Sequence, residues 1–371
     1  MKKKLGFIFG TRPEIIKLSP LIKLCRAKKV PFFCIHTGQH YSYDMDEIFF
    51  RDLELPSPDY KLHIRSKAPF RQGEHTGRML IDIEHILLKE KPYSVVVQGD
   101  TNTVLAGALS AEKISTTMSF TGLHIKVAHV EAGLRSYDRN MPEEVNRFIA
   151  DHLSDYLFTP TAKEKQILLK EGAPPGWIHV TGNTIVDALR LHLGNAQERK
   201  SILDELGLLK GSYILLTLHR QENVDSKRSF GDIIRGISLV GKEVKLPIIF
   251  PMHPRTKKML QKHKLRLPSC VRVIEPVGFM DFLQLEANAR LAMTDSGGVQ
   301  EETCILKVPC VTLRHNTERP ETVEVGSNIV AGTEPGSILR AARKMLKAKR
   351  MWRQPFGDGK ASERMLEIML R

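Results

Sequence analysis

The chain has 371 residues, a formal net charge of +14 at pH 7, 42% hydrophobic residues and 26% charged residues. This composition is ordinary for a soluble globular protein, and no apolar stretch approaches the roughly 20 residues that a membrane-spanning helix needs. The five cysteines form no CxxC pair, so neither a disulfide framework nor a metal site is expected. The length favours two domains of roughly 150–200 residues each.

The basic residues are scattered along predicted helices and do not form runs. A generic solvated surface explains this charge most simply, and attraction of a small polyanionic substrate comes next, so we expect no nucleic-acid partner and no membrane partner. The lysines at 2–4 resemble the start of a signal peptide, but the apolar segment after them, residues 5–9, is too short. We therefore expect a cytoplasmic protein.

Strands and helices alternate along the chain in two series. The first series has predicted strands at 4–9, 32–35, 94–97, 125–130, 157–158 and 178–180, with helices starting at Pro13 and Pro142 and covering 79–87 and 104–111. The second series has strands at 213–218, 248–250, 271–274, 291–293 and 310–313, with helices at 230–240 and 338–346. Such alternation predicts α/β domains whose parallel sheets carry helices on both faces. We expect two doubly wound, Rossmann-like domains that face each other across a cleft, with a boundary near 184–205.

Ligands of open α/β sheets bind beyond the carboxyl ends of the strands. Charged residues and glycines come after many of the predicted strands, which indicates one polar, anion-binding site; the candidates are Arg12, Gln39, His40, Asp100, Glu131, His219, His253, Ser296, Gly297, Gly298, Arg314 and His315. Each has a simpler structural explanation as well. Arg12 could cap a turn, Asp100 could cap a helix, and Glu143 could form a surface ion pair with Arg147 at i, i+4.

The stretch "TDSGGVQEE" at 294–302 suits a nucleotide. The turn at Ser296, Gly297 and Gly298 precedes a helical run that opens with two glutamates, and a helix N-terminus attracts phosphate. The carboxylate of Glu302 could accept hydrogen bonds from ribose hydroxyls. No strand-to-helix turn reads GxGxxG and no GxxxxGK[ST] loop is present, so NAD and ATP-driven phosphoryl transfer are disfavoured and no cofactor is expected.

Seven motifs, in order, resemble those of one known family. They read "FGTRPEIIKLSP", "QGDTNTVLAG", "AHVEAGLRS", "MPEEVNR", "TLHRQEN", "TDSGGVQEE" and "RHNTERPE". Together, from residue 5 to about 345, they are similar to the non-hydrolysing UDP-N-acetylglucosamine 2-epimerases. The resemblance implies the GT-B fold, with an N-terminal domain at 1–187, a UDP-binding domain at 188–354 and a C-terminal helix at 355–371 that packs back on the first domain. It also implies an isomerase that interconverts UDP-GlcNAc and UDP-ManNAc for polysaccharide synthesis, and we expect a homodimer.

The resemblance further implies roles for individual residues. The diphosphate would be bound by Arg12, Lys17, His219, Ser296, Gly297, Gly298 and Arg319. Glu302 would bind the ribose, and the segment from Val277 to Phe282 would bind uracil, with Phe282 beneath the ring. Some family members have glutamine where Val277 stands, which leaves a backbone contact there. Asp100, Glu131 and Glu143 would act as acids and bases.

The chemistry at C2 favours an elimination. The hydrogen at C2 of the sugar is not next to a carbonyl, so either C3 is first oxidised by NAD or the C1–O bond breaks first. Without a dinucleotide motif we expect the second route, in which UDP leaves to give a 2-acetamidoglucal and then adds back. His219 joins the catalytic residues here, because cations must stabilise the departing UDP.

Three alternatives remain open at this point. A GT-B glycosyltransferase would bind a UDP-sugar in the same way but would also need an acceptor. A non-catalytic sensor would keep Glu302 but would have no need of the three acids. An epimerase acting on a related UDP-N-acetyl-amino sugar is the hardest to exclude, because the residues that choose the sugar are not readable from the sequence.

The family also suggests a second, regulatory UDP-GlcNAc site. Gln39 and His40 match the segment that binds the activator in bacterial members, but Tyr41 and Ser42 replace an arginine and a glutamine there. Arg65 or Arg71 could substitute. We expect a weakened second site and less dependence on the activator.

Overall fold

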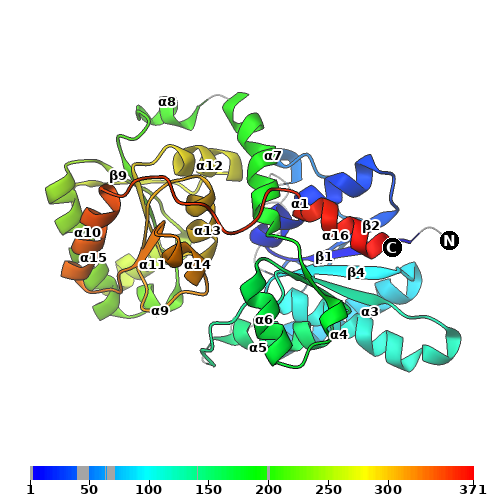
Figure 1. The fold of residues 1–371 in the computed structure, drawn as a ribbon. Helices are drawn as coiled ribbons and strands as arrows, with labels where there is room; N and C mark the ends of the chain where they lie inside the picture. Colours follow the sequence, from blue (N-terminus) through cyan, green and yellow to red (C-terminus); the bar gives the residue numbers. More distant parts are fainter. Residues whose placement is uncertain (1–2, 40–49, 63, 65–71, 140, 199–200) are drawn as a thin grey trace. The chain divides into compact units, whose positions relative to one another are not determined.

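The computed structural model describes residues 3–39, 50–62, 64, 72–139, 141–198 and 201–371. Contacts divide the chain into two compact units, residues 1–191 with 356–371 and residues 192–355 (Figure 1). We call them unit 1 and unit 2. In the described part of the chain no helix is both long enough and apolar enough to cross a membrane.

Unit 1 is built on a parallel sheet that has seven strands in the described residues, in the order β3-β2-β1-β4-β5-β6-β7. The strands are β1 (Leu5–Phe9), β2 (Phe32–His36), β3 (Tyr60–Lys61), β4 (Ser94–Gln98), β5 (Lys126–Val130), β6 (Tyr156–Thr159) and β7 (Ile178–Val180). The helices are α1 (Arg12–Ala27), α3 (Gln72–Glu90), α4 (Asn102–Thr117), η1 (Ser119–Thr121), α5 (Pro142–His152), α6 (Ala162–Lys170), η2 (Pro175–Trp177), α7 (Thr184–Glu198, which continues into unit 2) and α16 (Ala361–Leu370).

Unit 2 repeats this architecture with six strands in the order β10-β9-β8-β11-β12-β13, counted over its described residues. The strands are β8 (Ile214–Thr217), β9 (Ile248–Pro251), β10 (Val271–Ile274), β11 (Leu291–Thr294), β12 (Cys310–Thr312) and β13 (Asn328–Val330). The helices are α8 (Ile202–Leu206), α9 (Gln221–Val224), α10 (Lys227–Val244), α11 (Pro254–His263), α12 (Phe279–Ala287), α13 (Gly297–Ile305), α14 (Pro320–Glu324) and α15 (Pro335–Leu346).

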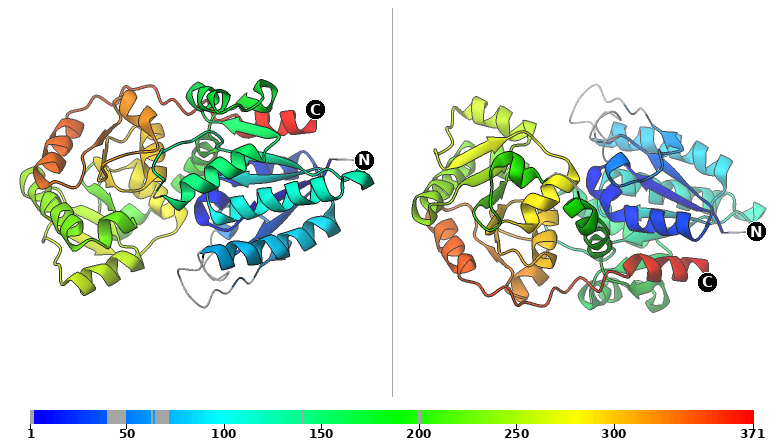
Figure 2. Two further views of the ribbon diagram at one scale, coloured as in Figure 1. Left: turned by 90° about the horizontal axis from the view of Figure 1, so that it is seen from below. Right: turned by 90° about the horizontal axis from the view of Figure 1, so that it is seen from above.

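Apolar strands and amphipathic helices explain these layers. The central strands β1, β4, β8 and β11 are buried almost throughout, as expected for parallel strands covered on both faces. The helix predicted at 79–87 lies within α3 and buries Met79, Ile83, Ile86 and Leu87 beside α4. In unit 2, α10 packs against α15. The last helix, α16, packs against α1 within unit 1 (Figure 2).

The predicted α/β class and its two parallel sheets are confirmed, with two differences in detail. The two-residue strand β3 and the three-residue strand β13 were not predicted, because such short edge strands carry too few apolar residues for a pattern. The helix predicted to open at Glu301 begins earlier, at Gly297, with Ser296 in an extended conformation before it.

Candidate functional site

The strand order of each sheet marks where a ligand would bind. The order runs one way from β1 and the other way from β4 in unit 1, and likewise from β8 and from β11 in unit 2. Such switch points leave an opening at the carboxyl edge of the sheet. The predicted site residues come directly after these central strands or their neighbours, so each unit has one candidate edge; we call them the unit 1 edge and the unit 2 edge.

At the unit 1 edge, Glu131 comes directly after β5 and is surrounded by hydrogen-bond donors. Its carboxylate accepts a 2.5 Å bond from Nζ of Lys17, a 2.7 Å bond from Asn183, and a bond from Gln98. Glu131 is 5% exposed, and its φ of 69° lies in the left-handed region that glutamate rarely adopts. Strained backbone of this kind clusters at functional sites, and the three donors favour the ionised carboxylate.

Asp100 lies just after β4, next to Glu131. Gln98 pairs with Val130 in the sheet, and a Cβ on Gly99 would lie 3.8 Å from Oε2 of Glu131, so the two loops touch. The carboxylate of Asp100 forms an ion pair with Arg147 of α5, whose Nε donates over 2.9 Å. The sequence had suggested that Arg147 pairs with Glu143; the partners that the structure shows are Asp100 at the sheet edge and Glu144 on α5.

The backbone just before Asp100 is anchored by a buried histidine. Nε2 of His129 lies 2.7 Å from the carbonyl oxygen of Gly99, and its Nδ1 lies 2.7 Å from Asp151. Burial alone would lower the pKa of His129, but the adjacent carboxylate of Asp151 raises it. The buried pair of His129 and Asp151 therefore holds the backbone of the loop that carries Asp100.

The two glutamates of "MPEEVNR" lie in different environments. Glu143, in the first turn of α5, is partly exposed. Glu144 is buried, accepts the backbone N–H groups of Ser136 and Tyr137, and pairs with Arg147 over 2.6 Å. Glu144 is therefore structural, whereas Glu143 is accessible to a ligand.

Arg12 and Glu14 belong to the first motif. Arg12 is the first residue of α1. Glu14 is 1% exposed and accepts from the backbone N–H of Gly10 and the hydroxyl of Thr101, over 2.9 and 2.7 Å. Burial raises the pKa of Glu14 to about 7, although these hydrogen bonds oppose the shift. This acid links β1 to the turn after Asp100.

Gln39, the candidate activator residue, makes a local contact. Its Oε1 accepts the backbone N–H of Thr103 over 2.9 Å and the hydroxyl of the same residue over 2.8 Å, so it satisfies a free donor in the first turn of α4. His40, Tyr41, Ser42, Arg65 and Arg71 lie outside the described residues.

At the unit 2 edge the buried carboxylate of Asp295 organises the loop after β8. It accepts the backbone N–H groups of His219 and Arg220, over 3.0 and 2.9 Å, and the side chain of Asn223 over 3.1 Å. Asp295 has no exposed surface. The imidazole of His219 lies 3.4 Å from it and is 41% exposed, which leaves a face open to a ligand.

The surroundings of His219 favour the neutral form of its imidazole. Burial against the loop lowers its pKa, and Arg220 and Arg255 add to that effect, while Asp295 and Glu222 oppose it. A neutral imidazole can still donate one hydrogen bond to a phosphate, and an arriving anion would favour its protonation.

The turn at residues 296–298 begins α13. The backbone N–H of Ser296 donates to Thr294 over 2.9 Å, and Gly297 is the first helical residue. A Cβ at Gly297 would lie 2.6 Å from Oε1 of Glu318, so a side chain there would displace this carboxylate. The helix α13 thus begins at the turn where the sequence predicts an anion-binding helix terminus.

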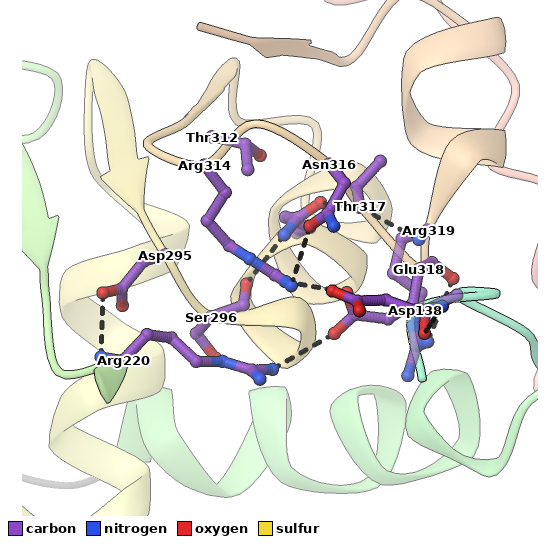
Figure 3. A network of polar contacts seen from close by, with 12 residues as sticks. Asp138, Arg220, Asp295, Ser296, Thr312, Arg314, Asn316, Thr317, Glu318 and Arg319 are labelled. Atoms are coloured by element: carbon purple, nitrogen blue, oxygen red, sulfur yellow. Dashed lines mark hydrogen bonds and ion pairs between the residues drawn. The ribbon is translucent and has the colours of Figure 1, made fainter. Parts of the chain in front are cut away.

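A buried cluster of arginines and acids supports the turn (Figure 3). Glu318 accepts Arg314 over 2.7 Å and Arg220 over 3.1 Å. Although burial raises the pKa of Glu318, Arg314, Arg319 and Arg220 together hold it well below its usual range. Nε of Arg319 lies 2.6 Å from Oε1 of Glu301. The first glutamate of the pair at 301–302 is therefore an anchor for an arginine.

The nucleoside candidates lie on neighbouring elements of unit 2. Oε1 of Glu302 lies 3.9 Å from the position of a Cβ on Gly298, so this carboxylate faces the first turn of α13. Val277 and Phe282, at the start of α12, pack on the same hydrophobic cluster and are half-buried. No group of three or more metal-ligating side chains occurs in the described part of the chain.

Three structural residues were missed by reasoning from sequence. Asp295 and Glu318 lie inside motifs in which other residues were singled out, and Asn183 comes from a distant segment. Arg147 was named, but its pairing with Asp100 was not predicted. In the sequence, an acid that follows apolar residues is only a weak indication that Asp295 has a structural role. Nothing local identifies Asn183.

Two Rossmann-like units, each built on a parallel sheet with a polar carboxyl edge, are typical of the GT-B fold. The family model described as UDP-N-acetylglucosamine 2-epimerase matches residues 23–370. The chain belongs to the UDP-N-acetylglucosamine 2-epimerase family, whose members are isomerases.

Relatives span the whole chain. The UDP-N-acetylglucosamine 2-epimerase of Methanocaldococcus jannaschii is 53% identical, over 99% of this chain and 98% of that protein. A crystal structure of the enzyme from that organism with UDP-GlcNAc and UDP has a TM-score of 0.90 at 53% identity, covering 99% of both chains. A UDP-2,3-diacetamido-2,3-dideoxy-D-glucuronate 2-epimerase of Pseudomonas aeruginosa is 38% identical, over 99% of each chain.

Proposed function

We propose that this protein catalyses the reversible epimerisation of UDP-N-acetylglucosamine at C2 to give UDP-N-acetylmannosamine. The observation that carries the proposal is the family match over residues 23–370, made by a chain whose motifs lie at the carboxyl ends of strands around two switch points. The relative that was crystallised with UDP-GlcNAc and UDP supports the choice of substrate. An elimination and re-addition of UDP needs no metal or redox cofactor.

The reaction is an elimination followed by re-addition. The C1–O bond to UDP breaks with its electron pair going to UDP, and a carboxylate removes the proton at C2, which leaves a 2-acetamidoglucal and UDP. UDP then adds back to C1 while a proton is delivered to the opposite face of C2. Every atom of the substrate other than the exchangeable C2 hydrogen is retained, and no electron is gained or lost.

We assign proton transfer to the unit 1 edge. Asp100, Glu131 and Glu143 are the candidate acids and bases, and general acid–base groups contribute about 10²–10⁴-fold to a rate. The contacts of Glu131 with Lys17, Gln98 and Asn183 favour an ionised carboxylate, which suits a base.

We assign UDP binding to the unit 2 edge, and the family resemblance adds Arg12 and Lys17 as further candidates for the diphosphate. His219, Arg319, the side chain of Ser296 and the N–H groups of Gly297 and Gly298 would stabilise the negative charge of the departing diphosphate. Glu302 would accept the ribose hydroxyls, and Val277 to Phe282 would hold uracil. The ion pair of Lys17 with Glu131 gives this lysine a second task, that of holding the acid.

The closest rival is a 2-epimerase for a related UDP-N-acetyl-amino sugar. The relative from Pseudomonas aeruginosa, named for a diacetamido-glucuronate, supports keeping this alternative. A GT-B glycosyltransferase is a further rival. It would leave UDP-GlcNAc unchanged when no acceptor is present.

The test is to incubate the protein with UDP-GlcNAc alone in deuterated water and follow the sugar by NMR. We expect UDP-ManNAc with deuterium at C2, without added NAD or metal. Full retention of the original hydrogen would refute the elimination. A parallel panel of UDP-sugars would replace the substrate assignment if another sugar were turned over at least tenfold faster.

Assembly, location and regulation complete the proposal. We propose a cytoplasmic homodimer, to be tested by cell fractionation and by sedimentation. We also propose a weakened activator site: pure UDP-ManNAc should react at once, and a long lag that is abolished by a trace of UDP-GlcNAc would contradict this.

A further inference from the structure

Asn183, which was not among the predicted site residues, links the candidate base Glu131 to the C-terminal part of the chain. It comes directly before α7 and is 1% exposed. Its Nδ2 donates to Oε1 of Glu131 over 2.7 Å, and its Oδ1 accepts the backbone N–H of Ile185 over 3.0 Å. Its own backbone N–H donates to the carbonyl oxygen of Phe356 over 2.8 Å. The proposed function gives Asn183 no role.

The two side-chain contacts allow only one orientation of the Asn183 amide. An ionised carboxylate has no donor and must face the NH₂ group, whereas a backbone N–H must face the amide oxygen. The N–H of Ile185 is one that the first turn of α7 cannot satisfy within the helix. The amide of Asn183 therefore caps α7 with its oxygen and holds Glu131 with its nitrogen.

The backbone around Asn183 is held by residues 356–362, which we call the returning segment. The chain leaves unit 1 within α7, after residue 191, and enters it again at residue 356. Asp187 accepts the backbone N–H groups of the first two residues of α16, over 3.3 and 2.9 Å. Gly182 has a φ of 91°, and a Cβ there would lie 3.1 Å from the carbonyl oxygen of Phe356. The returning segment therefore fixes the start of α7 inside unit 1.

The charge of Glu131 depends on such partners. The charged groups around it are Lys17 of α1, whose Nζ lies 2.5 Å from Oε1, and Asp100 in the neighbouring loop, which is paired with Arg147. Oε1 thus receives a charged donor from Lys17 and a neutral donor from Asn183. Both favour the ionised carboxylate, which is the form that can accept a proton.

We propose that Asn183 is a positioning residue for Glu131: its amide holds the carboxylate in the orientation and the ionised form that proton transfer at C2 requires, and the returning segment holds the amide. The inference rests on the proposed role of Glu131 as a base and adds the part of the chain that keeps this base in place. Substitutions that displace Asn183 should then change the pH dependence of turnover, even where they do not touch Glu131.

The experiment measures kcat for the conversion of UDP-GlcNAc to UDP-ManNAc between pH 5 and pH 9. Asn183→Asp keeps an oxygen that can cap α7, since aspartate and asparagine are equally good caps. It replaces the donor to Glu131 by a like charge, which disfavours the ionised base. The pH below which kcat falls should therefore rise by roughly one unit or more. A kcat that is lowered by the same factor at every pH would indicate a structural role and overturn the proposal.

Two glycine substitutions test the returning segment. Gly182→Ala places a methyl group against the carbonyl oxygen of Phe356, next to Asn183, and should raise the same pH limit by a smaller amount. Gly122→Ala is the matched control, because Gly122 also has a positive φ, 74°, but a Cβ there meets nothing within 4 Å. It should keep the wild-type profile. Equal profiles for the two glycine variants would refute the role of the returning segment.

Glu131→Gln separates the inference from the function on which it rests. If it lowers kcat by about 10²-fold while Asn183→Asp keeps the wild-type kcat and pH profile, the positioning role is wrong and proton transfer by Glu131 stands. If Glu131→Gln keeps the wild-type kcat, both are wrong. Should Asn183→Asp fail to fold, Asn183→Ser decides, because serine also caps a helix but has no amide for Glu131. A wild-type pH profile for Asn183→Ser would refute the positioning role.

Discussion

The two units use the same sheet architecture to present opposite chemistry. At the unit 1 edge the predicted site groups include carboxylates, Asp100 and Glu131, and their supports are cations and amides such as Arg147, Lys17 and Asn183. At the unit 2 edge the groups assigned to the diphosphate are donors, and buried carboxylates support them and their neighbour Arg220: Asp295 beneath His219, Glu318 beside Arg220, and Glu301 beside Arg319.

This inversion suggests how a doubled fold can divide one reaction. A helix-terminal turn with arginines is suited to a diphosphate, whereas carboxylates held by donors are suited to moving a proton. The buried partner decides which group faces outward, because a charge in the interior must be paired. Changes at the two edges should therefore affect different measurements.

The largest expected effect is on turnover, from the unit 1 edge. Asp100→Asn, Glu131→Gln and Glu143→Gln should each lower kcat by about 10²-fold or more, the usual scale for an acid–base group. Asp100→Asn and Glu143→Gln should each change the dissociation constant of UDP by less than about threefold, whereas Glu131→Gln also removes a partner of Lys17, which is assigned to the diphosphate.

Steady-state kinetics beside UDP titration measure the contrast between the edges. Glu84→Gln, at an exposed position on α3, is the matched control and should leave both quantities unchanged. An unchanged kcat for Glu143→Gln would restrict the proton-transfer role to the other two acids.

Next in size is a pH effect on the stability of unit 1. Because burial raises the pKa of Glu14 from 4.5 to about 7, its neutral form favours folding, fully so below pH 4.5, and this contribution is lost as the pH rises towards 7. The shift corresponds to roughly 3 kcal/mol. Glu14→Gln should remove this pH-dependent contribution. The free energy of unfolding of the variant, relative to that of the wild type, should therefore be higher at pH 8 than at pH 5. Urea titrations at both values measure this, and parallel pH profiles would contradict it.

The unit 2 edge should respond through stability and UDP binding together. Asp295→Ala leaves two N–H groups and the Asn223 side chain without their acceptor, at a cost of about 1–3 kcal/mol for each unpaired buried group. We expect a lower melting temperature and weaker UDP binding. Asp295→Asn, which keeps one acceptor, should have a melting temperature and a UDP affinity between those of the wild type and of Asp295→Ala. Normal UDP affinity in a destabilised Asp295→Ala protein would separate this loop from the ligand.

The smallest effect concerns Gln39, which tests whether the unit 1 edge does more than proton transfer. Gln39→Ala removes the acceptor for the first turn of α4 and should cost about 0.5–2 kcal/mol, as for other caps. Thermal unfolding measures that cost. If the variant also changes the initial rate with pure UDP-ManNAc, Gln39 contributes to an activator site beyond its structural contact.

Much of the architecture could be read from the chain because its signals are local. Buried parallel strands are apolar runs, Pro13 and Pro142 mark helix starts, and the turn at Gly297 stands out beside its strand. The candidate residues of both edges were found at the carboxyl ends of the predicted strands. That rule works because parallel strands end at the same side of a sheet.

The sequence by itself determined the fold class, the family and the loops that carry the candidate site residues, since these depend on periodicity and on short motifs. Only the tertiary structure decided which charges are paired. Arg147 was assigned to a helix surface and reaches Asp100, Glu301 anchors Arg319, and Asn183 reaches Glu131. Pairing depends on which side chains meet after distant segments pack, and the free energy of a buried charge depends on that neighbour rather than on its own place in the chain.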